Sequence, residues 1–251
     1  MDIIQEFYDN LASKYELLFS NWESSSKEQA AVLKNILNSY GLDNSARILD
    51  CACGIGTQAI GLAELGYNVT ASDISENELK EAKTRCLGKS LNIEFRHADF
   101  RNLESAFSES FDVLIAMDNA LPHMLNTFDL VKAARSISGR IKKGGLFIAS
   151  IRDYDEILKA KPHYSPPYIH ETEIDKRVSF QTWNWHGDNY KLTQYIIEDE
   201  NKLSVSKFEC EYKAIRKDEL YSVLINNGFS EAKWLSNDES GYYQPIIVAK
   251  K

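Results

Sequence analysis

The chain has 251 residues, 43% of them hydrophobic and 26% charged, a composition that fits one α/β domain with an insertion. Its formal net charge of -8 and its lack of a basic stripe argue against a nucleic-acid partner, because phosphate contacts need a concentrated basic face. Residues 1–10 lack the pattern of a signal peptide, and no apolar run is long enough to span a bilayer. We therefore expect a cytoplasmic protein with no membrane partner.

Residues 1–40 are predicted to form two helices. Apolar side chains recur near helical spacing at Ile4, Phe7, Leu11, Tyr15 and Leu18, and the second helical pattern stops at Gly41. No strand is expected before Arg47.

Strands and helices then alternate up to residue 151. We expect strands at 47–52, 68–73, 93–99, 111–118 and 144–151, and helices at 57–66, 75–88 and 126–141. The runs at 111–118 and 144–151 are almost wholly apolar, as is typical of buried parallel strands. Such alternation predicts a parallel sheet with helices on both faces.

The pattern changes at Asp153. A proline-rich loop at 161–169 precedes three closely spaced aromatic strands at 177–186, 190–200 and 203–215, which predict an antiparallel meander with turns at 187–189 and 200–201. A helix at 217–228 and strands at 231–236 and 241–251 complete the chain. We therefore predict one domain from residues 1–152 and 218–251, with an N-terminal helical lid (1–45) and an antiparallel β cap inserted at 153–217.

Four cysteines are too few for the disulfide framework of a secreted protein: Cys51, Cys53, Cys86 and Cys210. The pair at 51 and 53 has no second ligand pair near it, so we expect no metal site.

A Gly-x-Gly bend follows the first predicted strand, in the stretch LDCACGIGTQ. Gly54 and Gly56 are followed by an acid, Asp73, at the end of the second strand, which is part of the fingerprint of a nicotinamide dinucleotide site. However, Asp50 would place a negative charge close to a pyrophosphate. S-adenosylmethionine carries an ammonium and a sulfonium that this carboxylate complements. We therefore predict S-adenosylmethionine, and its product S-adenosylhomocysteine, as the ligands of this bend.

Two further acids suit that cofactor. Asp73 is placed to accept both ribose hydroxyls, and Asp99 to accept the adenine amino group while Phe100 flanks the ring.

Five motifs resemble, in their order along the chain, those of class I S-adenosylmethionine-dependent methyltransferases. They are LDCACGIGTQ, ASDIS, HADF, FDVLIAMDNALPHML and KKGGLFIASIRDYD. The resemblance implies a Rossmann-like, doubly wound, mostly parallel seven-stranded sheet. Ala52 stands where many members have a glycine. By the same resemblance the motifs contribute a further group of cofactor-binding residues, namely Ala52, Cys53, Gln58, Ile74, Met117 and His123.

The subgroup resembled is that of glycine and glycine/sarcosine N-methyltransferases, on the segments FYDNLASKYELLFSNWE, DNALPH and IRDYD. The resemblance implies that Arg152 holds the substrate carboxylate and that Asn119 orients the substrate. It also implies that Tyr15 and Trp22 close over the cofactor. Ile151 replaces a histidine of those relatives, which leaves the substrate open.

Several of these residues have alternative roles. Arg152 could instead form an ion pair with Asp153, Asp155 or Asp118. His123 could be a general base, although a histidine packing near the cofactor is the simpler interpretation. Trp183 and Trp185 are expected in the core or in an oligomer contact, and one of Tyr242 and Tyr243 could face the site.

The sequence thus predicts an enzyme that methylates a small molecule, with glycine, sarcosine or a related amine as the leading acceptor. An O- or C-methyltransferase of another metabolite and a catalytically silent cofactor-binding protein are the alternatives. Whether the chain forms a homo-oligomer is left open.

Overall fold

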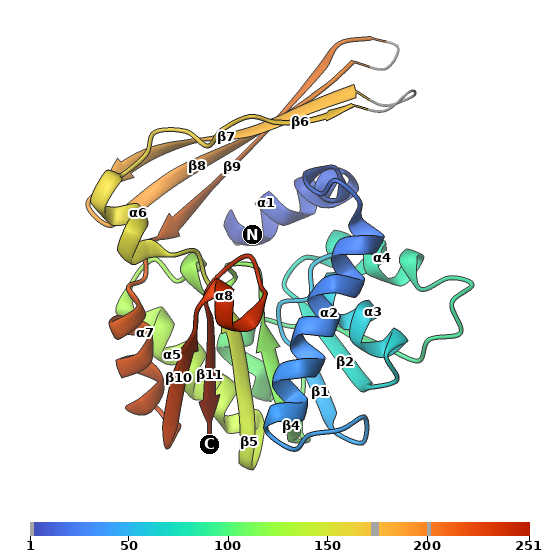
Figure 1. Ribbon diagram of the computed structural model, residues 1–251, viewed down its shortest axis with the longest axis vertical. Helices are drawn as coiled ribbons and strands as arrows, with labels where there is room; N and C mark the ends of the chain where they lie inside the picture. The colour runs from blue at the N-terminus through green and yellow to red at the C-terminus, as the bar shows by residue number, and fades with distance from the viewer. Residues whose placement is uncertain (1–2, 172–175, 200–201) are drawn as a thin grey trace.

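The computed structural model describes residues 3–171, 176–199 and 202–251. Its main sheet has seven strands in the order β10-β11-β5-β4-β1-β2-β3 (Figure 1). These strands are β1 (Arg47–Asp50), β2 (Asn68–Asp73), β3 (Glu94–His97), β4 (Phe111–Ala116), β5 (Ile141–Ser150), β10 (Glu231–Leu235) and β11 (Ile246–Lys250). β11 pairs antiparallel with both of its neighbours, and the pairs among the first five strands are parallel. This confirms the predicted Rossmann-like, doubly wound fold.

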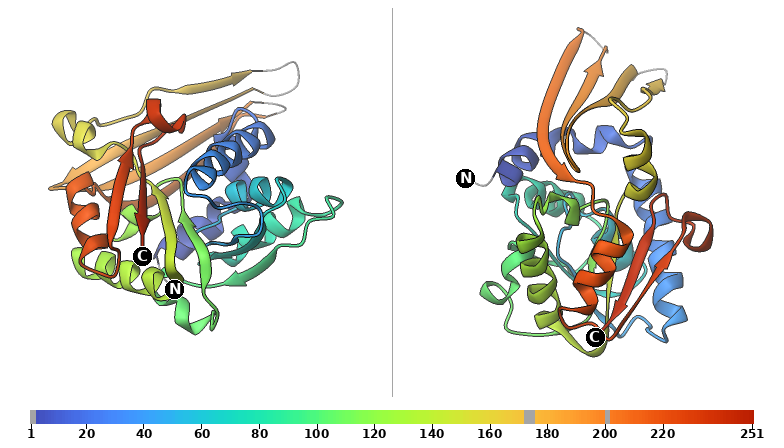
Figure 2. Two further views of the ribbon diagram at one scale, coloured as in Figure 1. Left: turned by 60° about the horizontal axis from the view of Figure 1, so that its bottom comes forward. Right: turned by 90° about the vertical axis from the view of Figure 1, so that its left-hand side faces the viewer.

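Helices cover both faces of this sheet, as Figure 2 shows. The helices along the chain are α1 (Ile3–Leu11), α2 (Trp22–Ser39), α3 (Thr57–Glu64), α4 (Glu76–Arg85), α5 (Thr127–Arg140), α6 (Tyr154–Ala160), α7 (Lys217–Ile225) and α8 (Asn237–Ser240). Three 3-10 segments accompany them, η1 (Ala12–Leu18), η2 (Phe100–Ser105) and η3 (Leu121–His123).

The side chains of β4 contribute alternately to the hydrophobic cores on the two faces of the sheet. Val113 and Ile115 belong to the core cluster that contains α2 and α3, whereas Leu114 and Ala116 belong to the cluster that contains α5 and α7. Successive side chains of a strand point to opposite faces, so a strand covered on both sides must be apolar at every position. This accounts for the apolar run that extends from Val113 to Met117.

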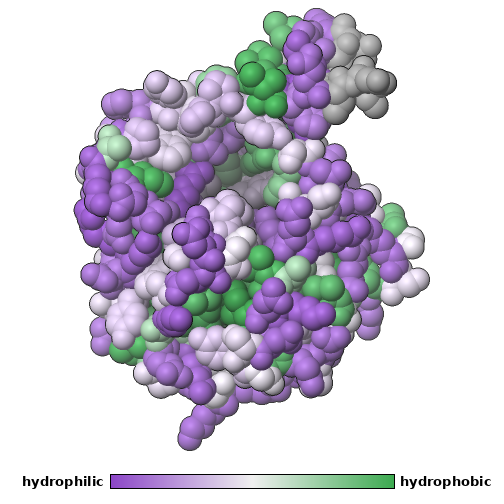
Figure 3. Space-filling view, viewed as in Figure 1, coloured by the Kyte–Doolittle hydropathy of each residue, from purple (hydrophilic) through white to green (hydrophobic). Residues whose placement is uncertain are grey.

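The segment after β5 forms a second, four-stranded antiparallel sheet in the order β6-β7-β8-β9. Its strands are β6 (Tyr168–Glu171), β7 (Lys176–His186), β8 (Asn189–Glu198) and β9 (Ser204–Lys213). Figure 1 shows this sheet above the carboxyl ends of the parallel strands, with α1 between the two. We call this four-stranded sheet (β6–β9) the upper sheet. The recess between it and the seven-stranded sheet with its helices is visible in Figure 3.

Some predicted elements differ from the structure. The first helix is α-helical only to Leu11 and continues as the 3-10 segment η1, and α6 and β6 occupy stretches for which no helix or strand was predicted. Residues 200–201, at the predicted second turn, and residues 1–2 of the predicted lid lie outside the described residues.

No described helix is both long enough and apolar enough to cross a membrane.

Candidate active site

The loop between β1 and α3 lies at the point where the strand order reverses, since the chain runs outward from β1 on one side and from β4 on the other. Open α/β sheets bind ligands at such a switch point, beyond the carboxyl ends of the strands. Gly54 and Gly56 have φ angles of 52° and 89°, a region that glycine enters without steric cost. A Cβ on Gly56 would lie 2.8 Å from the Ile60 side chain, so the sequence requires glycine there for packing as well.

A cavity with about 720 Å³ of empty space opens above this loop. Its lining comes from the ends of β1 to β4, together with α1, η1 and the start of α3. The predicted cofactor residues that line it are Tyr15, Ala52, Cys53, Gly54, Gln58, Asp73, Ile74, Asp99, Phe100, Met117 and His123.

Three predicted cofactor residues, Trp22, Asp50 and Gly56, are not among the residues that line this cavity, so their role in cofactor binding stays a prediction. Gly56 and Asp50 are both buried. Trp22 packs with Ile55 and Ile60, and its indole N–H donates to the Thr57 hydroxyl at 2.9 Å. Trp22 therefore supports the loop from behind.

Asp73 is buried and accepts two backbone N–H groups, from Gly54 at 2.8 Å and from Ser75 at 2.9 Å. Burial raises the pKa of this carboxyl, and these hydrogen bonds offset part of the rise. Burial also raises the pKa of Asp50 well above its ordinary value, and its Oδ2 has no hydrogen-bond partner among the described residues. An unpaired buried carboxylate oxygen is costly, and a cationic ligand nearby would offset that cost.

Asp99 lies at the start of η2 and is paired with Arg101, whose Nε donates to Asp99 Oδ2 at 2.7 Å. Both residues line the cavity. The carboxylate that was expected to meet the adenine amino group is thus held by a neighbouring guanidinium.

His123 is buried, and its Nε2 lies 2.8 Å from the hydroxyl of Tyr8 on α1. Its other ring nitrogen lies 3.5 Å from Cys210 Sγ on β9. The imidazole therefore connects η3 with α1 and with the upper sheet, in keeping with the expected packing role.

A second cavity, with about 1740 Å³ of empty space, lies between the upper sheet, α1, η1, α2 and the loop before β11. Tyr8, Tyr15 and Asp118 line both cavities, so the two adjoin at these residues. Both predicted acceptor residues, Asn119 and Arg152, line the second cavity only.

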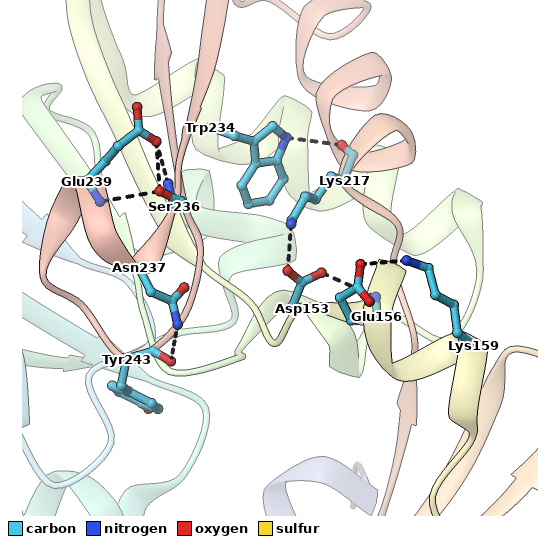
Figure 4. A network of polar contacts seen from close by, with 9 residues as sticks. All are labelled: Asp153, Glu156, Lys159, Lys217, Trp234, Ser236, Asn237, Glu239 and Tyr243. Atoms are coloured by element: carbon cyan, nitrogen blue, oxygen red, sulfur yellow. Dashed lines mark hydrogen bonds and ion pairs between the residues drawn. The ribbon is translucent and has the colours of Figure 1, made fainter.

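Arg152 reaches this second cavity from the end of β5. Its guanidinium donates to the Tyr190 hydroxyl and to Gln181 Oε1, each at 3.0 Å, and lies 4.9 Å from the centre of the Trp183 ring. Among the described residues no carboxylate pairs with it. The expected alternative partner Asp153 pairs instead with Lys217 Nζ at 2.8 Å, as Figure 4 shows. Arg152 thus presents an uncompensated positive charge to the cavity.

Asn119 is buried in the turn after β4. Its Oδ1 accepts from the Arg152 backbone N–H at 3.1 Å and from the Tyr154 hydroxyl at 3.0 Å. Its Nδ2 has no partner among the described residues. A buried amide donor that is left unpaired indicates a ligand acceptor atom at this position.

Asp118 precedes Asn119, and both have positive φ angles, 55° and 72°. Outside glycine this conformation is uncommon and concentrates at functional sites. The turn is held to β5, because the Asp118 N–H donates to Ser150 Oγ at 2.8 Å and the Asn119 N–H to Ser150 O at 3.1 Å.

Two of the three residues that line both cavities, Tyr8 and Asp118, were not predicted as site residues from the sequence. Tyr8 lies seven residues before Tyr15, so their helical spacing could have placed both on one face. Asp118 stands beside the predicted Asn119 but was considered only as an ion-pair partner. Both Tyr242 and Tyr243 line the second cavity, where only one tyrosine was expected to face the site.

Comparisons with known proteins agree with this geometry. Residues 48–145 match the family model described as a methyltransferase domain. The chain is 25% identical over 261 residues to a glycine/sarcosine N-methyltransferase of Aphanothece halophytica, an alignment that covers 98% of this chain and 90% of the relative.

The chain is an S-adenosylmethionine-dependent methyltransferase.

Two further proteins are similar to this methyltransferase, one over part of its sequence and one in its fold. The glycine N-methyltransferase of Homo sapiens is 28% identical over 167 residues, covering 61% of this chain and 56% of the human protein. Among solved structures, the sugar N-methyltransferase KedS8 of Streptoalloteichus has a TM-score of 0.77 at 15% identity, with 94% of this chain and 92% of that chain covered. At this identity the structural likeness shows the fold.

The residues present fit the cofactor. Gly54 leaves room for a ligand at the cavity wall, and a carboxylate at Asp73 faces the cavity as a hydroxyl acceptor. The unpaired oxygen of Asp50 beneath the loop adds negative charge that suits a cationic ligand.

Proposed function

We propose that this methyltransferase N-methylates a small amine that carries a carboxylate, such as glycine or sarcosine. The observation that carries the proposal is the uncompensated charge of Arg152 on the wall of the second cavity. Since arginine stays protonated in proteins, this charge needs a counter-charge from a ligand. The planar guanidinium suits a carboxylate, and the free Nδ2 of Asn119 supplies a further donor.

In this proposal the cofactor lies in the cavity above the Gly54 loop. Asp73 accepts the ribose hydroxyls, Asp99 and Phe100 flank the adenine, and Tyr15 borders both ligands as part of a lid formed by residues 1–45. The inserted segment 153–217 forms a cap that closes the acceptor cavity. S-adenosylmethionine supplies a methyl group that is already activated by its sulfonium.

The protein's contribution is then to hold the acceptor in place and to exclude water. Holding two reactants in a productive orientation contributes up to about 7–11 kcal/mol in well-oriented systems. Arg152 and Asn119 would hold the acceptor, and the aromatic residues of α1, η1 and the cap would keep water out. No protein nucleophile is needed, because the leaving group is already activated.

A substitution at Arg152 tests the proposal. Arg152→Lys should leave S-adenosylmethionine binding intact and raise the KM for glycine or sarcosine by about ten- to hundredfold, a loss of roughly 1–3 kcal/mol. The reason is that lysine offers one point charge where the guanidinium offers two parallel hydrogen bonds. Arg216→Lys, at an exposed guanidinium that lines neither cavity, is the matched control. Equal KM values for the Arg152→Lys variant and the wild type would refute the carboxylate clamp.

The extent of the second cavity favours a second candidate, an amino sugar. Its lining reaches from Gln181 on β7 to Glu28 on α2, which leaves room for an acceptor larger than glycine, and the structurally similar KedS8 is described as a sugar N-methyltransferase. Formation of S-adenosylhomocysteine with a panel of amino acids and amino sugars distinguishes the two. Turnover confined to amino sugars that lack a carboxylate would replace the first candidate with the second.

A further inference from the structure

Asp118 is the acidic residue among the three that line both cavities, the other two being Tyr8 and Tyr15. It follows β4 and lines both the cofactor cavity and the acceptor cavity. A methyl acceptor must bring its reacting atom to this junction, because the transferred group comes from one cavity and the acceptor from the other. Any polar group at the junction therefore lies next to the reacting atom.

The hydrogen bonds that Asp118 accepts all come from neutral donors. The Tyr243 hydroxyl and Gln58 Nε2 each donate at 2.8 Å, and the Tyr242 hydroxyl donates to the same carboxylate. No lysine, arginine or histidine among the described residues forms an ion pair with it. These donors orient the carboxyl group, and no described cation pairs with it.

The second cavity thus holds a guanidinium and a carboxylate that have no ionic partner among the described residues, Arg152 and Asp118, together with the exposed carboxylate of Glu28. Arg152 and Asp118 follow β5 and β4, which pair in parallel, and neighbouring strands lie about 4.8 Å apart. A hydrogen bond joins the two strand ends, since the Arg152 backbone N–H donates to the Asn119 side-chain oxygen Oδ1. Two opposite charges held apart in this way complement a ligand with two opposite charges, such as an amino-acid zwitterion.

We propose that Asp118 is the amine-recognition residue of the acceptor site. It accepts an N–H hydrogen bond from the acceptor's ammonium or amine group at the cavity junction, opposite the carboxylate held by Arg152. This inference rests on the proposed function and adds the second half of acceptor recognition. An ammonium adds a charge–charge attraction to this hydrogen bond that an alcohol cannot supply, so the carboxylate would select amines over alcohols of the same shape.

Binding measurements separate the two charges. The probes are glycine, which has both charges, acetate, which has only the carboxylate, and methylammonium, which has only the cation. Each is titrated into the protein saturated with S-adenosylhomocysteine, for the wild type, Asp118→Asn and Arg152→Lys. The inference predicts that Asp118→Asn weakens glycine and methylammonium at least tenfold and acetate less than threefold, and that Arg152→Lys weakens acetate but not methylammonium.

Asp238→Asn is the matched control, because it removes an equal charge from an exposed residue of α8 that lines neither cavity. Melting temperature and S-adenosylhomocysteine affinity verify that each variant is folded. If Asp118→Asn binds glycine and methylammonium as the wild type does, the inference is overturned while the carboxylate clamp stands. If acetate is insensitive to Arg152→Lys but methylammonium is lost in Asp118→Asn, the carboxylate clamp fails and amine recognition stands. If neither glycine nor methylammonium binds the wild type, amine recognition is overturned.

Discussion

At the scale of single residues, Glu78 is a charge-bearing group in a site that does not suit a charge. The side chain is fully buried in the first turn of α4, and neither carboxyl oxygen has a hydrogen-bond partner among the described residues. Burial raises its pKa well above the ordinary value, and the nearby Asp73 adds to the rise. The folded protein therefore binds a proton here more tightly than the unfolded chain does.

This gives a direction for the pH dependence of stability. The raised pKa of Glu78 contributes to the free energy of unfolding. This contribution is fully present below the unfolded-state pKa and is lost as the pH rises through the folded-state pKa. Glu78→Gln imitates the protonated form, so its melting temperature should match the wild type near pH 4 and exceed it increasingly toward pH 8. We expect a gain of roughly 1–3 kcal/mol at the upper end, the scale of one buried unsatisfied group.

Thermal unfolding of both proteins across this range is the measurement. Glu76→Gln, an exposed acid on the same helix, should show no such trend. A Glu78→Gln variant that is less stable than the wild type at pH 8 would contradict the argument, and would point to a charged Glu78 with a function in the folded protein.

Several residues of the candidate site could be placed from the sequence because they follow strands directly. Asp73, Asp99 and Asn119 each stand at or just after the end of a predicted strand, and the carboxyl ends of parallel strands meet at one edge of a sheet. Trp22 could not be placed this way, since its position depends on how α2 packs against α3. A tryptophan side chain has a large apolar ring and one N–H donor, and both features suit a lid residue as well as a buried supporting residue.

At the scale of elements, the upper sheet is joined to the N-terminal segment by a buried arginine. Arg177 on β7 donates from Nε to Leu17 O at 3.1 Å and from a terminal nitrogen to Phe19 O at 2.9 Å. Leu17 and Phe19 lie at the end of η1, the segment that carries Tyr15 to both cavities. This contact couples the proposed lid and the proposed cap.

Arg177→Met should loosen that coupling while keeping most of the apolar stem. Hydrogen bonds that involve a charged group contribute about 1.5–3 kcal/mol, so amide exchange in residues 12–19 should become at least about tenfold faster. Hydrogen exchange followed by mass spectrometry measures this directly. Lys176→Met, at the neighbouring exposed residue of the same strand, is the control. Unchanged exchange in residues 12–19 would mean that other contacts hold η1 in place.

The elements that sequence reasoning missed are short or depend on tertiary contacts. The α6 stretch is only seven residues long, and its start is stabilised by the Asp153 side chain, which accepts from the Glu156 N–H (Figure 4). The change from α1 to η1 leaves no trace in the spacing of apolar residues, because both helix types place them on one face. By contrast, the buried parallel strands are predicted well, since their apolar runs reflect burial on both faces.

At the scale of the whole molecule, negative charge accumulates around the cofactor cavity. Asp73 and Asp118 line the cavity, Asp50 lies under its loop, and burial raises the pKa of all three. The overall formal charge of -8 adds to a field that favours cationic ligands. Part of this acidity is masked in the free protein, because groups with a raised pKa hold protons above their ordinary range.

This arrangement makes cofactor binding proton-linked. A cation near these carboxyls favours their charged forms and lowers their pKa, so binding should release protons at pH values above the ordinary aspartate range, and affinity should rise with pH there. Calorimetric titration at one pH in two buffers of different ionisation enthalpy counts the protons released. S-adenosylhomocysteine has the same shape but lacks the sulfonium charge, so it should release fewer protons than S-adenosylmethionine. Equal release by the two ligands would mean that the sulfonium does not reach these carboxyls, and no proton release with either ligand would show that the buried acids are already charged in the free protein.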